Sequence, residues 1–437
     1  MKDSNTLRQF RHDIHDCFLR GKDALFNTVD ALMTETQARS FPEISQSLWF
    51  ERKWPSLYKA FEDGRIDGQY LREIFARYLP KPDAGKWLWI GIDASKIARP
   101  DAITSEDRTA QYVHNLPECK KPITFGWQFS TVVTLPEEAS SWTYQLDQQR
   151  VTSQTTAIEV ACTQIKGLIP YLPKNAILVL DRGYDANWLW CQCSALDIGV
   201  VCRLKSNRCF YRLAPAPTGK KGGPRKDGAK LQPKDLTTHH DPDGIWSGTD
   251  EKGRPIEITW WKHLHIKQAR YLDMTVIRVV RSDARNTERD PRVSWFAWMG
   301  NAQVDIAQVG LGYARRFSQE HGYRFDKQAL LWEQPRLRTP EQFERWTQIV
   351  AIVHNHLVLA RDLVEPELRP WESKRRAPSP QQVRRGIHKL LSQLGTPAQP
   401  PQPRGKSKGR IIGAKVKKAQ RFPVIRKRPK LPQLVPS

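Results

Sequence analysis

Two short apolar runs constrain the fold more than any other feature of the chain, and an acid follows the apolar core of each. The first run reads WLWIGIDAS and covers residues 87–95, and the second reads AILVLDRGYD and covers residues 176–185. Runs of this length and composition are typical of central strands that are buried on both faces of a sheet. The sequence therefore predicts two buried strands with Asp93 and Asp181 at their carboxyl ends.

The segments around these runs read as strands and helices in alternation. We predict further strands at residues 123–135, 142–151 and 200–205, and helices at residues 155–169 and 186–197. Three early strands followed by alternating helix and strand favour an α/β fold with a mixed sheet and helices on its faces. From about residue 206 to 292, a basic loop and strand-like runs at 254–263 and 271–281 indicate a β-rich insertion. Helical patterns resume near Val304 and include residues 339–364.

Apolar residues near the N-terminus recur at helical spacing, with Lys and Arg interleaved. One set comprises Leu7, Phe10, Ile14, Phe18, Leu25, Val29 and Leu32, and another comprises Leu57, Phe61, Tyr70, Ile74 and Tyr78. Small helical units with cations on one face are common DNA readers, although a plain helical bundle has the same pattern. We therefore expect a helical domain over residues 1–82.

The charge of the chain makes an anion its expected partner. The formal charge is +24, and residues 366–437 alone carry nineteen Lys or Arg against two acids, a net of +17. This segment, the basic tail, is too poor in apolar residues to fold alone, so we expect it to be disordered. A membrane surface could attract it, but no apolar run approaches the roughly 20 residues that span a bilayer, and the first residues lack a signal peptide. Nucleic acid is the better expectation.

The cysteines favour reduced thiols over a metal site. Seven cysteines are an odd number in a large chain without a secretion signal. Cys191, Cys193, Cys202 and Cys209 cluster in the sequence. Their spacing is not a usual one for zinc, and free cysteine is often simply buried.

A stripe of polar residues lies further along the chain. Tyr313, Arg316, Glu320 and Lys327 follow one another at steps of three, four and seven residues. On one helix these four directions fall within roughly 60° of each other, so a single acid would lie beside two cations and a phenol. This pattern suits an acid that binds a divalent cation between groups that hold a phosphate backbone. The alternative is the solvated face of an ordinary charged helix.

Asp93 and Asp181 add two acids of the same kind. A carboxylate at the end of a buried strand is costly unless it is paired, hydrogen-bonded or bound to metal, although aspartate is also favoured in plain turns. Together with Glu320, the two aspartates could hold a pair of divalent cations about 3.5–4 Å apart. Such a pair activates a water or a 3′-hydroxyl and stabilises the leaving oxygen of a phosphodiester. Nucleophilic serine motifs, a Walker loop and a GxGxxG motif are absent.

The order of these acids resembles a known family. Strand-borne Asp93 and Asp181, then Glu320 within an intact Y-x2-R-x3-E-x6-K signature, look like bacterial insertion-sequence transposases of the DDE class. The resemblance spans about residues 87–330, and the 139 residues from Asp181 to Glu320 resemble the subgroup with a β-strand insertion. It implies a ribonuclease H-like catalytic domain over residues 83–365. In the family, the three acids bind the metals, and the Tyr, Arg and Lys help to hold transposon-end DNA.

By this resemblance, Asp93, Asp181 and Glu320 are catalytic metal ligands, and Tyr313, Arg316 and Lys327 bind DNA. The implied cofactor is Mg²⁺, for which Mn²⁺ can substitute, as two ions. The implied partners are double-stranded DNA, both the inverted terminal repeats and the target, and further copies of the chain, as a homodimer or larger assembly on DNA. A membrane is not expected, and the implied location is the bacterial cytoplasm, at the nucleoid.

Other residues could take part in the chemistry. Asp185, Asp101, Glu106 and Asp107 lie near the two aspartates and could support them, although their loop settings favour plain solvation. Some enzymes of this family stack a flipped base on a tryptophan while they cut the second strand. Trp246, Trp260 and Trp261 in the insertion could do so, although a place in the core or on the sheet is the more common one.

A DNA transposase that cuts element ends and joins the 3′-hydroxyl to target DNA is the leading expectation. Two alternatives remain open. One is a non-catalytic DNA-binding protein derived from a transposase, and the other is a metal-dependent nuclease of the same fold that never joins strands.

Overall fold

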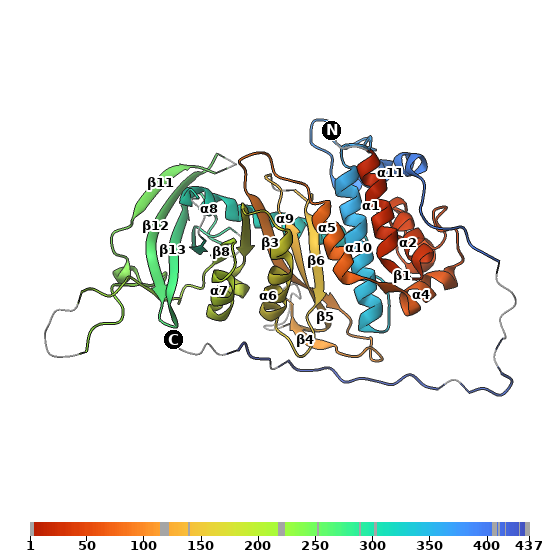
Figure 1. The fold of residues 1–437 in the computed structure, drawn as a ribbon, viewed down its shortest axis with the longest axis horizontal. Coiled ribbons are helices and arrows are strands. Elements are labelled where there is room, and N and C mark those ends of the chain that lie inside the picture. Colours follow the sequence, from red (N-terminus) through yellow and green to blue (C-terminus); the bar gives the residue numbers. More distant parts are fainter. Residues whose placement is uncertain are drawn as a thin grey trace.

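In the computed structural model, the described residues form a twelve-stranded mixed sheet with helices packed against it (Figure 1). The described residues are 4–113, 122–138, 140–216, 223–250, 253–287, 290–300, 304–403, 409, 411–415, 417–427 and 429–432. The central strands are arranged in the order β6–β5–β3–β7–β8. They are β3 (Leu88–Ala98), β5 (Ile123–Thr134), β6 (Tyr144–Arg150), β7 (Ala176–Leu180) and β8 (Gly199–Arg203). This order agrees with the ribonuclease H-like core that the resemblance implied.

The two apolar runs form neighbouring parallel strands, as predicted. Every residue of β7 is buried, and β3 is buried from Leu88 to Ile92. In the register of the two strands, Ile92 lies beside Leu180. Asp93 and Asp181, each the next residue along, therefore lie at the same edge of the sheet. The predicted helices before and after β7 are also confirmed, as α6 (Ala157–Leu168) and α7 (Asn187–Ser194).

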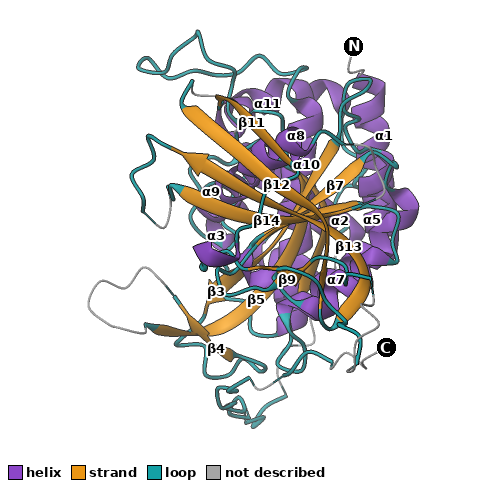
Figure 2. Ribbon diagram, turned by 90° about the vertical axis from the view of Figure 1, so that its left-hand side faces the viewer, coloured by secondary structure: helices purple, strands orange, loops and turns teal. Residues whose placement is uncertain are grey.

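Helices cover both faces of the sheet (Figures 1 and 2). Helix α6 lies on one face, where Gln164 is hydrogen-bonded to Ser130 of β5, and α7 packs on the same face. The opposite face carries α8 (Ile306–Gly312) and α9 (Phe317–Gln328). Because side chains alternate along a strand, Trp89 and Asp93 belong to this second face, together with Val179 of β7. The face that carries Asp93 is therefore the one that α8 and α9 cover.

The predicted β-rich insertion extends the same sheet. Its strands are β9 (Phe210–Tyr211), β10 (Lys230–Leu231), β11 (Gly244–Thr249), β12 (Pro255–Ile266) and β13 (Ala269–Arg281). The chain then returns through β14 (Val293–Met299), which pairs with β8. The predicted strands correspond to β12 and β13, whereas β11, β14 and the edge strand β4 (Thr109–Tyr112) were not predicted. Residues 217–222 of the predicted basic loop lie outside the described residues.

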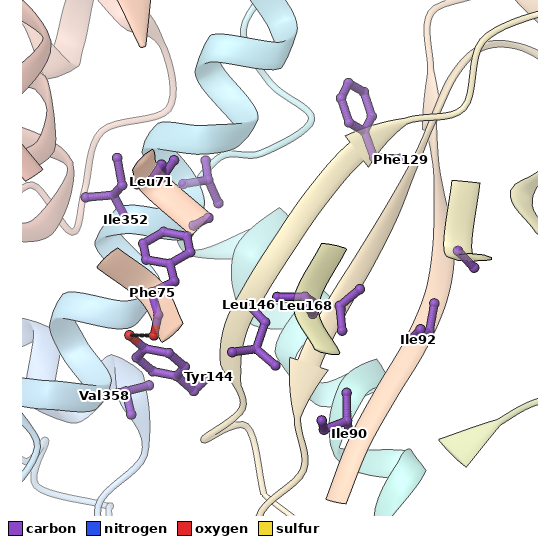
Figure 3. Close-up of a cluster of buried hydrophobic side chains, with 14 of the residues drawn as sticks. Leu71, Phe75, Ile90, Ile92, Phe129, Tyr144, Leu146, Leu168, Ile352 and Val358 are labelled. Carbon is purple, nitrogen blue, oxygen red and sulfur yellow. Dashed lines mark hydrogen bonds between the residues drawn. The ribbon is translucent and has the colours of Figure 1, made fainter. Parts of the chain in front are cut away.

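The predicted N-terminal helices pack against the sheet in two ways, through one long helix and directly through the last of them. They are α1 (Ser4–Cys17), α2 (Lys22–Thr34), α3 (Phe41–Ile44), α4 (Trp54–Asp63) and α5 (Gly68–Arg77), with a small pair of strands, β1 (Phe18–Arg20) and β2 (Arg65–Ile66). Helix α10 (Pro340–Ala360) lies between β6 and helices α1, α2 and α4, whereas α5 contacts β6 directly. Figure 3 shows this packing, in which the Tyr144 hydroxyl of β6 donates a hydrogen bond of 2.9 Å to the carbonyl of Phe75 in α5. In the described part of the chain, no helix combines the length and the apolar character needed to cross a membrane.

The expectation of a disordered tail is wrong for residues 380–394, which form helix α11 (Pro380–Leu394). Val383, Ile387 and Leu391 recur every four residues and are buried against α2 and α10, so this part of the tail does carry an apolar face. Arg384 is also buried, and its guanidinium donates hydrogen bonds to the carbonyls of Leu32 and Glu35 at the end of α2. It donates another, of 2.8 Å, to the carbonyl of Ala329 at the end of α9. The start of the tail therefore helps to hold α9 in place.

A second part of the tail lies along the edge of the sheet. The backbone N–H of Ile425 donates to the carbonyl of Arg108 at 2.8 Å, and the N–H of Ala110 donates to the carbonyl of Ile425 at 3.2 Å. Ile425 thus pairs in parallel with Thr109 of β4. These backbone hydrogen bonds need no apolar composition, which explains why the sequence pattern gave no sign of them.

The buried His356 of α10 predicts a pH dependence of stability. Desolvation, with the nearby charge of Arg11, lowers the pKa of His356 from 6.5 to about 3. Below pH 6.5, His356 therefore binds a proton in the unfolded chain but not in the folded chain, and the free energy of unfolding falls as the pH falls. We expect a loss of about 2 kcal/mol between pH 8 and pH 5 from this group. Urea unfolding at both pH values should show a smaller pH effect for His356→Leu than for wild type, and equal pH effects would contradict this assignment.

Candidate active site

Three acids gather around one arginine at the carboxyl edge of β3 and β7. The Arg316 guanidinium lies 3.4 Å from a carboxylate oxygen of Asp93 and 3.3 Å from one of Asp181. It also lies 3.5 Å from a carboxylate oxygen of Glu320. The structure thus brings together all three acids that the sequence singled out, although they are separated by up to 227 positions in the chain.

The cluster contains more acidic than basic side chains, and this imbalance determines its electrostatics. Three carboxylates face one guanidinium, which leaves a net charge of −2 when all are ionised. Desolvation raises the pKa of Asp93, an effect that Arg316 opposes and Asp181 reinforces. Desolvation acts to lower the pKa of Arg316, but Asp93 and its neighbouring groups outweigh it and raise that pKa. A concentration of negative charge on a strongly basic chain is suited to a cation, and not to the DNA backbone itself.

Hydrogen bonds to the backbone set the positions of the acids. The backbone N–H of Gly183 donates to the Asp181 carboxylate at 2.6 Å, in the turn that follows β7. On the other side, the Tyr323 hydroxyl of α9 donates to the carbonyl of Asp93 at 2.9 Å. The Gln319 side-chain amide donates to the carbonyl of Thr131 in β5 at 3.1 Å. Gln319 and Tyr323 thereby fix the helix that carries Glu320 against the strand that carries Asp93.

The sequence reasoning missed Gln319 and Tyr323. Both are on α9 within one turn of Glu320, and Gln319 is buried. Their spacing from Glu320 could have indicated them. They lie one position before and three positions after Glu320, on the side of the helix that packs onto the sheet.

The predicted four-residue stripe does not lie on a single helix. Tyr313 and Arg316 belong to a 3₁₀ turn, η4 (Tyr313–Arg316), and α9 begins only at Phe317. Just before this turn the chain passes very close to Trp89, because a Cβ atom on Gly312 would lie 2.2 Å from the indole ring. The tight approach at Gly312 followed by the narrower turn places Arg316 over the acids.

Like Arg316, the other two predicted DNA-binding residues are engaged within the protein. The Tyr313 ring packs at a tilt of 44° against the ring of Phe296 in β14, with ring centroids 4.4 Å apart, and desolvation raises the pKa of Tyr313. The Lys327 ammonium lies 2.5 Å from the Glu333 carboxylate and donates to the carbonyl of Lys96 at 3.2 Å. Lys327 is half-buried, so its ammonium remains near the surface.

An open hollow of about 760 Å³ adjoins Glu320 on the outer side of α9. Its lining includes Lys327, Arg39 and Arg324 as cations, and Ser95 of β3, two residues beyond Asp93. Arg39 and Arg324 are exposed. The hollow therefore borders Glu320 of the three acids and carries three cations, of which Lys327 is paired with Glu333 in the same lining. No sequence spacing indicated this feature.

The competing acids have other roles. Asp185 was expected to be solvated, but it is buried and lies 2.6 Å from the guanidinium of Arg208. Its carboxylate also accepts a hydrogen bond from the backbone N–H of Lys205, so it fixes the chain after β8. Asp107 pairs with Arg150, and Asp101 and Glu106 are exposed.

The tryptophans of the insertion are built into the sheet to different degrees. Trp261 is buried and stacks on Trp295, with ring centroids 5.6 Å apart. Trp246 and Trp260 are half-buried and lie on the face that α8 covers. All three tryptophans therefore lie on the sheet, which is the more common setting for this residue type.

The donor chemistry of the acid cluster fits a divalent metal ion. Carboxylate oxygens are the ligands that Mg²⁺ and Mn²⁺ prefer, and an excess charge of −2 matches one such ion. Within the described residues, no three His, Cys, Asp or Glu side chains form a ready-made set of metal ligands, and this includes the clustered cysteines. In the structure, Arg316 is the cation that lies beside all three acids.

Comparison with known proteins adds one match. Residues 13–264 match a family model described as "DDE superfamily endonuclease". The match covers more than half of the chain and includes Asp93, Asp181 and the N-terminal helices from the end of α1 onward. Among curated proteins, none matches the chain closely enough to count as a relative.

Proposed function

Because the chain belongs to the DDE superfamily of endonucleases, we propose that it is an insertion-sequence transposase. Membership supports a nuclease or transposase function and implies a DNA substrate. The proposed protein binds the inverted repeats at the ends of its element, cleaves the phosphodiester bond there, and joins the freed 3′-hydroxyl to target DNA. The intact Y-x2-R-x3-E-x6-K signature from Tyr313 to Lys327 supports the insertion-sequence origin.

The observation that carries this proposal is the meeting of Asp93, Asp181 and Glu320 around Arg316. Members of the superfamily use divalent metal ions. We assign Asp93, Asp181 and Glu320 as the ligands of Mg²⁺, with Mn²⁺ as a substitute and two ions in the complete site. When bound, the metal would supply activation of the attacking oxygen and stabilisation of the leaving oxygen.

The protein groups around the acids orient and hold the DNA. Arg316 balances the charge of the acids, and its guanidinium is of the kind that binds a phosphate through two parallel hydrogen bonds. We assign Lys327, which lines the 760 Å³ hollow, to the backbone of the DNA end. Arg39 and Arg324 would extend this contact along the hollow. We also assign Tyr313, which is half-buried and packs against Phe296, to the binding of the same DNA end.

The remaining parts of the chain complete the proposed complex. Residues 1–82 are proposed as the helical DNA-binding domain, residues 83–365 as the catalytic domain with its insertion at about 206–292, and the basic tail as a further DNA contact. The charge of +17 on the tail supports this last role. We propose that the active form is a dimer or larger assembly on paired element ends.

The test is cleavage of DNA that carries the inverted repeats flanking the gene. We expect nicking at the element end with Mg²⁺ and none with EDTA, and joining of pre-cut ends to a target plasmid. If the protein cleaves element ends but does not join pre-cut ends to the target, it is a metal-dependent nuclease and not a transposase. Specific binding of the ends with no cleavage under any divalent metal would replace it with a non-catalytic DNA-binding protein.

The hydrogen bond from Tyr323 to Asp93 predicts a positioning role for this tyrosine. Tyr323→Phe keeps the ring, which stacks on Trp332, but removes the bond that holds α9 to β3 at Asp93. We expect a cleavage rate about 10-fold lower at saturating DNA, as is typical of residues that orient metal ligands. The loss of stability should be about 1 kcal/mol.

Tyr184→Phe is the matched control for this variant. Tyr184 is buried close to the same acids, and its hydroxyl has no hydrogen-bond partner among the described residues. We expect a cleavage rate within about twofold of wild type, since no protein hydrogen bond is lost. Equal rates for the two variants would remove the special role of Tyr323.

A further inference from the structure

A second hollow, of about 370 Å³, lies behind the turn that carries Asp181. Its walls come from three places in the chain, namely the start of α7, the segment between β8 and β9, and the turn between β12 and β13. The cations on these walls are Lys205, Arg208 and Lys267. This cluster, the rear basic hollow, is distinct from the hollow beside Glu320, and none of the residues assigned above to metal or DNA lines it.

The rear basic hollow has a rigid floor. Arg208 donates to the carboxylate of Asp185 at 2.6 Å and to the side-chain oxygen of Asn187 at 2.7 Å. The same guanidinium lies over the ring of Trp190, 5.0 Å from its centroid. Asp185 also binds the backbone N–H of Lys205 at 2.7 Å. The single buried acid therefore offsets one positive charge and fixes the geometry of the wall.

The other two cations leave the hollow with an excess of positive charge. Lys205 and Lys267 are exposed, and neither forms an ion pair with an acid in the described part of the chain. The Lys267 ammonium lies 4.8 Å from the centroid of the Tyr211 ring, which holds it over the opening. Asp227, on the neighbouring segment, is already bound by His265 and Arg270. With one acid against three cations, the hollow carries a net charge of +2.

The neutral groups of the lining are also those that bind phosphate. Asn187, Asn207, Gln268 and Tyr211 supply amide and hydroxyl donors, and side chains of these types make many of the contacts to the sugar–phosphate backbone of DNA. The position of the hollow favours the same ligand, because Asp185 on its floor lies only four residues after Asp181.

We propose that the rear basic hollow binds a phosphodiester of double-stranded DNA outside the cleavage site. The choice of DNA as the ligand rests on the proposed function, whereas the existence of an anion-binding site is inferred from the cations and hydrogen-bond donors of the hollow. Lys205 and Lys267 provide the charge, and Arg208 and Asn187 provide the fixed surface against which the phosphate lies.

The experiment measures binding separately from cleavage. Fluorescence anisotropy in EDTA, with a labelled DNA duplex of random sequence, gives the affinity at several salt concentrations. We expect Lys205→Ala/Lys267→Ala to bind several-fold more weakly than wild type at low salt, with the slope of log K against log salt reduced by about one to two units. The control Lys226→Ala/Lys262→Ala removes the same charge from exposed positions of the insertion outside the hollow.

Each outcome decides the inference. A loss in the hollow variant that exceeds the loss in the control supports it, even if the wild type cleaves no DNA and the transposase proposal fails. Equal affinities and slopes for the two double variants would overturn it, even if the wild type cleaves element ends. Stabilisation of wild type by inorganic phosphate, lost in the hollow variant while DNA binding stays equal, would also overturn it and assign the hollow to a free anion.

Discussion

Glu320→Gln is expected to lower the rate of Mg²⁺-dependent end cleavage by at least about 100-fold, because even residues that only support a metal ligand cost about 10–100-fold when removed. The substitution keeps the size of the side chain and takes away its charge. Glu320 is half exposed, in the first turn of α9, and its only ion pair among the described residues is with Arg316. Little stability should therefore depend on it. A single-turnover cleavage assay with pre-bound DNA measures the effect.

The matched control for this prediction is Glu341→Gln. Glu341 is also a glutamate in the first turn of its helix, α10, and it is exposed. Both variants lose one negative charge at a helix N-terminus, so both lose the same small favourable interaction with the helix dipole. Only Glu320→Gln should lose cleavage, and it should still bind the DNA end. Cleavage by Glu320→Gln at the rate of the control would show that the acid cluster is not the catalytic site.

Arg11→Met is expected to lower the free energy of unfolding by about 3–5 kcal/mol, the usual effect of breaking a buried ion pair from one side. Arg11 of α1 and Asp30 of α2 are each 1% exposed and are joined by two hydrogen bonds of 2.7 and 2.9 Å. The same guanidinium donates to the carbonyl of Gly395 at the end of α11. The variant would leave the Asp30 carboxylate buried without its cation. Urea unfolding followed by circular dichroism measures the loss.

Two comparisons separate this cause from a general loss of packing. Arg11→Met/Asp30→Leu removes both charges and should recover much of the lost stability, because apolar pairs often replace buried ion pairs without cost. Lys59→Met breaks a solvent-exposed pair with Asp63, at 3.0 Å, and should change the stability far less than Arg11→Met does, because water screens the pair. A loss for Arg11→Met no larger than that for Lys59→Met would contradict the assignment of this pair as a structural centre of the N-terminal helices.

The sequence was most informative where one pattern decided both burial and position. The apolar runs that end in Asp93 and Asp181 are typical of central strands, and the parallel pairing of these strands places their ends side by side. The spacing from Tyr313 to Lys327 correctly selected the residues near the third acid. It could not show the break at η4, because that break depends on the approach of Gly312 to Trp89, a residue more than two hundred positions away.

The missed features share a dependence on contacts between distant segments. Helix α11 was judged by the average composition of the tail, which hid the buried face of Val383, Ile387 and Leu391. The engagement of Lys327 with Glu333 and the carbonyl of Lys96 requires the packing of α9 on β3. Arg316 was predicted to hold DNA, and its position among three acids follows only from the folded arrangement of two strands and a helix.

The most direct test of a metal-binding role for the acid cluster is a change of ligand chemistry at Asp181. The variant Asp181→Cys replaces a carboxylate, which suits Mg²⁺, with a thiolate, which binds the softer Mn²⁺ better. We predict that cleavage of element-end DNA by this variant is lost with Mg²⁺ and partly restored with Mn²⁺, while Asp101→Cys, at an exposed loop position, cleaves like wild type with either ion. Cleavage by Asp181→Cys at the wild-type rate with Mg²⁺ would contradict the account.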